Sequence, residues 1–247
     1  MASRTRIGIM MPSTNTTCEA DFQLAAPKDV TIHTHRLWMT NDSSGPEAFD
    51  HMNKEIEAAS RYLATGKMDA VAYACTSGSM VKGPGHDEEM IQLIESLASA
   101  PAAATSAAVV DALRYLGARR VSVATPYPKW QNDKIKEYLE ALGFEVLNIE
   151  GEPWASQQGH QGINDQDPET ILEFAAGVCR PEADVLYCSC TAWRAMEAAE
   201  ELERRTGKPV VTSNQATIWS AFRKAGITRP IPGFGRLLAA PAPVAVT

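Results

Sequence analysis

The sequence lacks the features by which membrane proteins, nucleic-acid-binding proteins and nucleotide-dependent enzymes are commonly recognised. No apolar run approaches the roughly 18 residues that a membrane-spanning helix needs. The 23 basic and 30 acidic residues give a net charge of −7, and no run of Lys or Arg is long enough to follow a phosphate backbone. No glycine-rich phosphate-binding motif follows the first predicted strand. We therefore expect no membrane partner, no nucleic-acid partner and no cofactor.

Cysteine is scarce as well. The 247 residues include five cysteines, an odd number that does not indicate a disulfide framework. The chain runs from Met1 into a predicted strand rather than a signal sequence, so we expect a cytoplasmic protein with free thiols. Cys188 and Cys190 lack the spacing of a zinc site or redox pair, and His33 and His35 have no third ligand. No metal site is predicted.

The sequence does contain two copies of one plan. In each copy a strand that ends at proline is followed by an aspartate, a short apolar run and a cysteine. The number of residues from the strand to the cysteine is nearly the same in the two copies. The apolar run predicts a buried strand, so each thiol is expected where a strand gives way to a loop or helix, which is where open α/β sheets carry their chemistry. The matching segments are Arg6 to Pro12 with Arg120 to Pro126, Asp69 to Thr76 with Asp184 to Thr191, and Thr105-Ser106 with Thr212-Ser213.

Strands that alternate with helical patterns predict parallel sheets covered by helices on both faces. We therefore predict an α/β protein of two pseudo-symmetric, doubly wound parallel-sheet domains with the active site between them. The first domain is expected to span residues 1–110 and the second 111–213, with the segment 214–240 returning to the first. The tail from Pro241 is expected to be frayed. Helices are predicted at 47–64, 87–98, 107–116, 132–142, 168–178, 193–205 and 215–225.

Cys75 and Cys190 are the candidate catalytic residues because the repeat places them on opposite walls of a cleft. A single cysteine usually behaves as a small buried hydrophobe, and Cys18, Cys179 and Cys188 are interpreted in that way. At a strand end beside a helix N-terminus, a thiol meets unpaired backbone N–H groups that favour the thiolate. The strand-end position favours Cys190 over Cys188 as the exposed cysteine. A thiolate there can attack carbon or accept a proton.

Short polar segments beside the thiols form the candidate carboxylate-binding site. Ser, Thr and Asn are also common helix caps, so the turn after the first strand has both interpretations. Tyr127 holds the place in the second copy that Ser13 holds in the first, and it either donates to a ligand or lines the rim of the cleft. Neutral amides and hydroxyls can hold an anion even in an acidic protein. The candidate ligand-binding residues are Ser13, Asn15, Thr76, Ser77, Tyr127 and Thr191.

Paired cysteines on two similar α/β lobes resemble the aspartate/glutamate racemase superfamily. Within it, the polar turn after the first strand resembles the opening of the maleate cis-trans isomerase family, and the resemblance covers nearly the whole chain. It implies Cys75 as nucleophile, Cys190 as its acid/base partner, and Asn15 and Tyr127 as carboxylate ligands. The segments that carry the resemblance are Pro12-Ser-Thr-Asn15-Thr-Thr, Ala74-Cys75, Gly83-Pro-Gly85, Thr125-Pro-Tyr127, Ser189-Cys190-Thr191 and Gly233-Phe-Gly-Arg-Leu-Leu.

The chain departs from that family pattern at two places. Maleate isomerases tend to follow the first cysteine with apolar residues, whereas Thr76-Ser77 follow it here, as in the related arylmalonate decarboxylases, which have glycine in place of Cys75. Those decarboxylases use the Thr-Ser pair to hold a carboxylate. The family also has an asparagine in the loop before the helix predicted at 168–178, a position that falls on His160 by ungapped counting and on Asn164 in a shifted register.

These features lead us to expect a cofactor-independent cis-trans isomerase of a small unsaturated dicarboxylate such as maleate. Two thiols suit racemisation or epimerisation beside a carboxylate equally well, because one can remove a proton that the other returns. Decarboxylation of a malonate needs only one thiol, and a ligand-binding sensor needs none. The expected partners are a small carboxylate substrate and a second copy of the chain in a homodimer.

Overall fold

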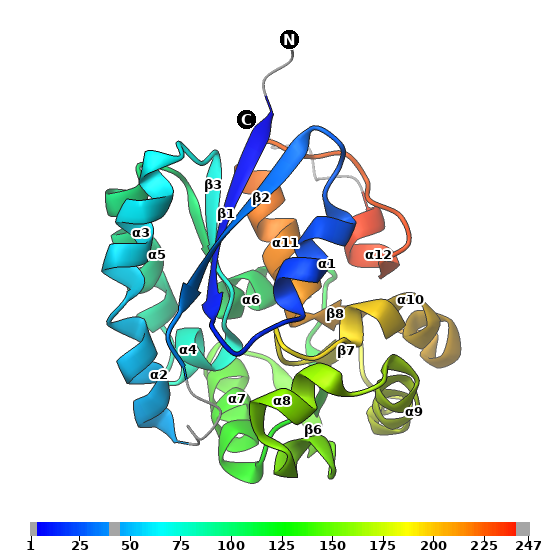
Figure 1. The fold of residues 1–247 in the computed structure, drawn as a ribbon. Helices are drawn as coiled ribbons and strands as arrows, with labels where there is room; N and C mark the ends of the chain where they lie inside the picture. Colours follow the sequence, from blue (N-terminus) through cyan, green and yellow to red (C-terminus); the bar gives the residue numbers. More distant parts are fainter. Residues whose placement is uncertain (1–3, 40–44, 241–247) are drawn as a thin grey trace.

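The computed structural model of the protein describes residues 4–39 and 45–240. It contains two four-stranded sheets, in the orders β2-β1-β3-β4 and β6-β5-β7-β8, and every strand pair is parallel. The first sheet lies in the upper part of Figure 1 and β6 in the lower part. The predicted α/β class with two helix-covered parallel sheets is confirmed. The strands are β1 (Thr5–Pro12), β2 (Val30–Leu37), β3 (Ala70–Tyr73), β4 (Ala102–Ala104), β5 (Arg120–Thr125), β6 (Glu145–Gly151), β7 (Val185–Cys188) and β8 (Val210–Thr212).

The strands that lead to the two thiols are buried on both faces, as a helix-covered parallel sheet requires. Every residue of β3 and of β7 is buried. Asp69 Oδ2 accepts the backbone N–H of Arg6 at 2.7 Å, and Asp184 Oδ2 accepts that of Arg120 at 2.8 Å. Each aspartate of the repeat therefore ties the start of its thiol-bearing strand to the first strand of its own sheet, which accounts for the matched spacing.

Helices cover both sheets. The helix predicted at 168–178 begins and ends there, and the Asp167 side chain caps it by accepting the N–H of Glu169 at 2.7 Å. The single helix predicted at 47–64 was wrong, because a turn at Lys54 and Glu55 divides it and the Glu55 carboxylate accepts the N–H of Trp38 at 2.6 Å. The helices are α1 (Cys18–Ala25), α2 (Pro46–Asn53), α3 (Ile56–Thr65), α4 (Thr76–Met80), α5 (His86–Ala98), α6 (Thr105–Tyr115), α7 (Lys129–Ala141), α8 (Gly159–Asp165), α9 (Pro168–Val178), α10 (Ala195–Thr206), α11 (Ser213–Lys224) and α12 (Gly235–Ala239).

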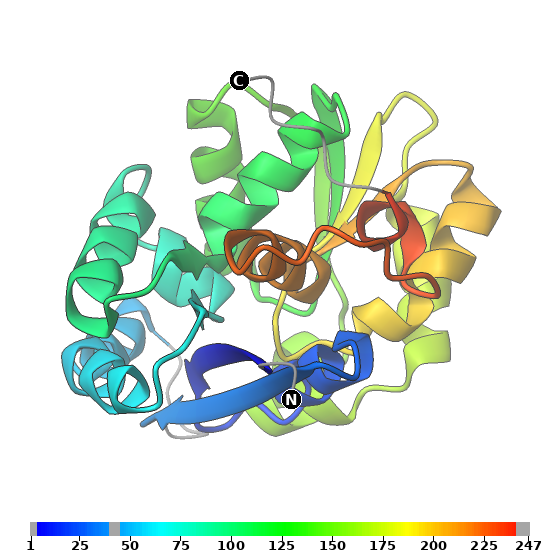
Figure 2. The same cartoon turned by 90° about the horizontal axis from the view of Figure 1, so that it is seen from above.

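The last helix of each repeat packs into the core of the opposite sheet. In α6, Val109 lies in the hydrophobic cluster that contains Val123 of β5, and in α11, Phe222 lies in the cluster that contains Ile9 of β1. The two helices contact each other, with α11 near the centre of the view in Figure 2. The boundary predicted after residue 110 falls inside α6, and the division into domains stays a prediction.

Membrane insertion finds no support in the helices described. Within residues 4–39 and 45–240, none is both apolar enough and long enough to cross a bilayer. The tail from Pro241, expected to be frayed, lies outside the described residues.

Candidate active site

Cys75 lies two residues beyond the end of β3 and is the N-cap of α4. Its Sγ accepts the backbone N–H of Gly78 at 3.3 Å, and only 4% of the residue is exposed. The hydroxyl of Tyr73 interacts with the thiol and donates to Asn53 Oδ1 at 2.5 Å. A Cβ on Gly78 would come within 2.0 Å of that hydroxyl, so this turn needs a residue without a side chain. The segment after β3 therefore closes tightly and directs an N–H group at the thiol.

Cys190 lies two residues beyond β7, in the matching place of the second sheet. Its φ of 143° is rare for a residue with a side chain, and such strain persists only where the surroundings fix it. Its N–H donates to Ser213 Oγ at 3.0 Å, and its Sγ accepts the N–H of Ala192 at 3.3 Å and interacts with the Tyr127 hydroxyl. The expectation that Cys190 is exposed was wrong, since 6% of it is accessible. Tyr127 and the loop that follows Cys190 bury the thiol.

The segments that carry the two thiols are in direct contact. Thr191 Oγ1 donates to the carbonyl of Ala74 at 3.3 Å and accepts from Asn15 Nδ2 at 3.1 Å. Asn15 Oδ1 also accepts the backbone N–H groups of Thr17 and Cys18, each at 3.0 Å, at the start of α1. Asn15 thus bonds N–H groups at the start of α1 and joins the turn after β1 to the Cys190 segment, which Thr191 in turn joins to the Cys75 segment.

Burial controls the protonation of the two thiols. It raises the pKa of Cys75 to about 12 and that of Cys190 to about 11. The N–H of Gly78 lowers the pKa of Cys75, while a charge on Cys190 raises it, and the Tyr127 hydroxyl lowers the pKa of Cys190. The expected N–H donors are present, but the expectation of an acidic thiol is wrong for the ligand-free protein because desolvation outweighs them.

Thr76 and Ser77 bond to side chains that are far from them in the sequence. Thr76 Oγ1 donates to Ser213 Oγ at 3.0 Å, and Ser77 Oγ accepts from Gln131 Nε2 at 2.9 Å. Each hydroxyl carries a single hydrogen. The bond from Gln131 therefore does not use the hydrogen of Ser77, whereas the bond to Ser213 does use that of Thr76.

Ser13 is directed at the end of β2. Its hydroxyl donates to the carbonyl of Met39 at 3.0 Å and accepts the N–H of Met39 at 2.9 Å. The Arg36 guanidinium donates to the carbonyls of Ser13 and Asn15 at 3.1 and 2.8 Å. Ser13 thus shapes the turn after β1, and its role in substrate binding stays a prediction.

The position left open before α9 lies in helix α8, which brings Asn164 against that same turn. Asn164 Oδ1 accepts the N–H of Thr16 at 2.9 Å, and its Nδ2 donates to the carbonyls of Thr14 at 2.9 Å and His160 at 2.8 Å. Asn164 is buried in this position. Of the two registers left open by the sequence, the geometry therefore favours Asn164.

Some residues that organise this region were not singled out from the sequence. Ser213 and Gln131 hold Thr76 and Ser77, as described above. Asn214 Nδ2 donates both to Asp21 Oδ2 at 2.6 Å and to the carbonyl of Thr191 at 2.9 Å. Burial raises the pKa of Asp21 to about 7, against the Asn214 hydrogen bond, which lowers it. The only signal for any of them was the repeated Thr-Ser pair that contains Ser213.

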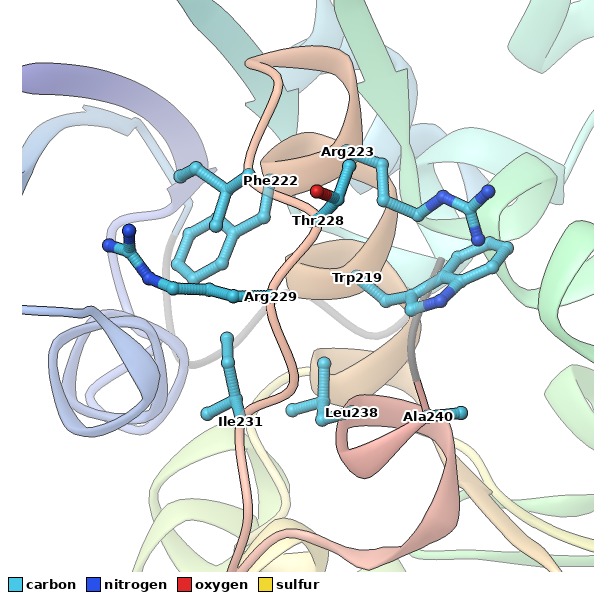
Figure 3. A pocket seen from close by; sticks show the side chains of 9 residues that line it. Trp219, Phe222, Arg223, Thr228, Arg229, Ile231, Leu238 and Ala240 are labelled. Carbon is cyan, nitrogen blue, oxygen red and sulfur yellow. The ribbon is translucent and has the colours of Figure 1, made fainter. Parts of the chain in front are cut away.

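A separate hollow under the C-terminal segment has no part in this arrangement (Figure 3). Its volume of about 20 Å³ leaves room for about one water molecule. The guanidinium of Arg223 lies over the Trp219 ring at 4.4 Å, so its cation is already engaged. The hollow is lined by Trp219, Phe222, Arg223, Ile227, Thr228, Arg229, Ile231, Leu238 and Ala240.

Across residues 4–39 and 45–240, no three His, Cys, Asp or Glu side chains are placed to hold a metal ion.

Known proteins with similar sequences and folds cover nearly the whole chain. A maleate isomerase of Nocardia farcinica is 29% identical over 245 residues, which cover 94% of this chain and 95% of that protein. An arylmalonate decarboxylase of Bordetella bronchiseptica is 29% identical over 244 residues, which cover 96% and 97%. A cysteine-to-serine mutant of the Nocardia farcinica maleate cis-trans isomerase, with a covalently bound succinylcysteine intermediate, superposes with a TM-score of 0.88 at 26% identity and covers 96% of this chain and 99% of its own.

The similarity also extends to a family model. The model for arylmalonate decarboxylase matches residues 7–238, a range that includes most of β1, both thiol segments and α11. The resemblance found in the sequence motifs is confirmed by this match and by the isomerase and decarboxylase relatives. The chain belongs to the arylmalonate decarboxylase family.

Proposed function

We propose that the protein is an isomerase that converts a small cis-unsaturated dicarboxylate, such as maleate, to its trans isomer by covalent catalysis at Cys75. The observation that carries the proposal is the pair of buried thiols at equivalent strand ends, each with one backbone N–H at 3.3 Å from Sγ. The maleate isomerase relatives support it, as does the succinylcysteine intermediate in the Nocardia farcinica protein.

The reaction is a reversible addition across the double bond. The electron pair of the Cys75 thiolate forms an S–C bond to one alkene carbon, and the π electrons take the proton of the Cys190 thiol at the other carbon. The new single bond rotates. The Cys190 thiolate then removes a proton from that second carbon, the double bond reforms, and Cys75 leaves as thiolate. The atoms and electrons balance without an oxidant, reductant or co-reactant, so no cofactor is required.

The two cysteines have unequal roles in the proposed reaction. The Tyr127 hydroxyl lowers the pKa of Cys190, whereas a charge on Cys190 raises the pKa of Cys75, so the proposal places the single negative charge of the pair on Cys190 before the attack. In that state Cys190 acts as the base that takes the proton of Cys75 as Cys75 attacks. Cys190 is then a thiol and can donate the proton to the neighbouring carbon.

Neutral donors are positioned to hold the substrate carboxylates. The Ser77 hydroxyl and the second amide hydrogen of Asn15 are the side-chain candidates, with Thr76 after it turns from Ser213 and Tyr127 after it turns from Cys190. Such fixed dipoles also offset the negative charge that builds on the carboxylate during addition. We therefore expect the site to accept an acid with two carboxylates.

Racemisation of an acid at the carbon beside its carboxylate is the second candidate, because the near-symmetric thiols suit two-base proton transfer. Decarboxylation of a malonate is the third, since Thr76-Ser77 resemble the carboxylate-binding pair of the decarboxylases. Proton NMR in deuterated water separates the three. We expect maleate to give fumarate, whereas exchange of the α-hydrogen of a saturated acid would indicate a racemase and loss of carbon dioxide from a malonate a decarboxylase. If maleate stays unchanged while either of the other reactions proceeds, the proposal fails.

The raised thiol pKa values predict a rate that increases with pH. Because both values lie well above neutrality, the singly charged thiol pair becomes about tenfold more abundant with each pH unit below them. We expect kcat/KM for maleate to rise with a slope near one on a logarithmic plot across the neutral and mildly alkaline range, with the protein's fold checked by circular dichroism at each pH. A flat profile would mean that the thiolate is already formed in the free enzyme.

A further inference from the structure

Ser213 is the side chain at which the two thiol segments meet. It is the first residue of α11 and is fully buried. Its Oγ accepts the N–H of Cys190 and the hydroxyl of Thr76, each at 3.0 Å, and lies 3.1 Å from the hydroxyl of Tyr187. One oxygen therefore connects the backbone of one thiol residue to the side chain that follows the other.

The hydrogen-bonding capacity of this oxygen is fully used. A serine hydroxyl has two acceptor sites and one hydrogen. Cys190 and Thr76 occupy both acceptor sites, so the hydrogen of Ser213 goes to Tyr187. Removing the oxygen would leave two buried donors without this partner. The resulting loss in the free energy of unfolding is larger than that from losing a single exposed hydrogen bond.

The bond to Cys190 matters because of that residue's backbone. At φ 143°, Cys190 is held in a conformation that it would leave if its N–H were released. In that conformation its Sγ receives the N–H of Ala192 at 3.3 Å and the Tyr127 hydroxyl. Loss of the strained geometry would take the thiol away from both donors.

We infer that Ser213 is a positioning residue, which holds Cys190 in the strained conformation that aims its thiol at its donors and fixes Thr76 beside Cys75. The role of Cys190 as proton donor rests on the proposed function, but its positioning by Ser213 does not. The titratable groups that interact with the Cys190 thiol are Cys18, Cys75, Tyr127 and Tyr187.

The repeat supplies a matched control residue. Ser106 in α6 corresponds to Ser213 in the sequence and is buried as well, but its hydroxyl donates to Asp87 Oδ2 at 3.1 Å. Cys75 has a φ of −148°, an ordinary extended value that needs no external restraint. Only the second lobe therefore depends on the serine to shape its thiol.

The experiment compares Ser213→Ala with Ser106→Ala, each in a Cys75→Ser background. The measured quantity is the alkylation rate of Cys190 by iodoacetamide at fixed mildly alkaline pH, followed on its own peptide by mass spectrometry. Because the released thiol would lose the Ala192 N–H and the Tyr127 hydroxyl, its thiolate should be less abundant, so we expect Cys190 in Ser213→Ala to react about threefold to tenfold more slowly. In Ser106→Ala the alkylation rate of Cys190 should stay within about twofold of that in its parent. This control measures how much the loss of any buried serine changes the rate.

Ser213→Cys provides a second variant that keeps the shape of the side chain but offers a weaker acceptor. If Ser213→Ala fails to fold, Ser213→Cys takes its place in the test, and its Cys190 should also be alkylated more slowly than in the parent. With Cys75 restored, Ser213→Ala should lower kcat at least about tenfold more than Ser106→Ala does.

An unchanged Cys190 alkylation rate in folded Ser213→Ala or Ser213→Cys would overturn the inference. Slower alkylation of Cys190 in Ser213→Ala, together with wild-type protein that leaves maleate unchanged, would instead support the positioning role and reject the proposed function. The two failures are therefore distinguishable.

Discussion

Replacing Cys75 with alanine is expected to lower kcat for maleate by at least about 10⁴-fold, because the variant lacks the atom that bonds to the substrate. The substitution removes one buried sulfur and leaves the polar groups of the turn in place. KM should change far less than kcat, since the side chains of Ser77, Asn15 and Tyr127 remain to hold the carboxylates. Initial rates of fumarate formation from maleate, measured over a range of substrate concentrations, give both constants.

Cys179→Ala is the matched control for loss of a thiol. Cys179 is a half-buried residue at the C-terminal end of α9 and belongs to neither thiol segment. We expect this variant to retain wild-type turnover within about twofold. A folded Cys75→Ala variant that retained more than about a hundredth of wild-type turnover would show that another group does the chemistry.

Replacing Cys190 with serine is expected to lower kcat by about 10²–10⁴-fold, the range typical for loss of a positioned acid or base. Serine keeps a hydroxyl near Ala192 N and Tyr127, but a hydroxyl is a much weaker acid and base than a thiol. The substrate can still enter, so the effect should fall on kcat rather than on KM. The same initial-rate measurement on folded protein gives the answer.

The Cys190→Ser variant also separates the isomerase from a two-thiol racemase. A racemase that lacks one thiol would still exchange the α-hydrogen of one enantiomer of its substrate in deuterated water, because the other thiol can remove it. The isomerase should show no such exchange with any saturated acid tested. One-sided exchange in Cys190→Ser would therefore favour the racemase.

Much of the fold could be predicted from the sequence because it repeats and because its strands are buried. The Asp69 and Asp184 positions carry the same backbone hydrogen bond in the two sheets, so their spacing to the cysteines is constrained by local geometry. The thiol positions followed from the same repeat. The break between α2 and α3 did not follow, because it involves a bond that the N–H of Trp38, just after β2, donates to Glu55.

The rest of the site depends on contacts between residues far apart in the chain. The bonds from Gln131 to Ser77 and from Thr76 to Ser213 join residues that are far apart in the sequence. No local sequence pattern predicts them. The thiol pKa values depend on burial by the assembled lobes, which is why the local argument for an acidic thiol failed. The homodimer and the cytoplasmic location stay predictions.

Covalent attack by Cys75 is tested most directly by peptide mass spectrometry of the Cys190→Ser variant, quenched with acid after incubation with maleate. Without Cys190, a proton from water has to complete the adduct, which then forms slowly but lacks the thiolate base that would reverse it. We predict that the peptide containing Cys75 gains the mass of one maleic acid, and that neither heat-denatured protein nor the Cys75→Ala/Cys190→Ser double variant gains it there. If wild-type protein isomerises maleate but the added mass lies on another cysteine, or on none, covalent catalysis at Cys75 is contradicted.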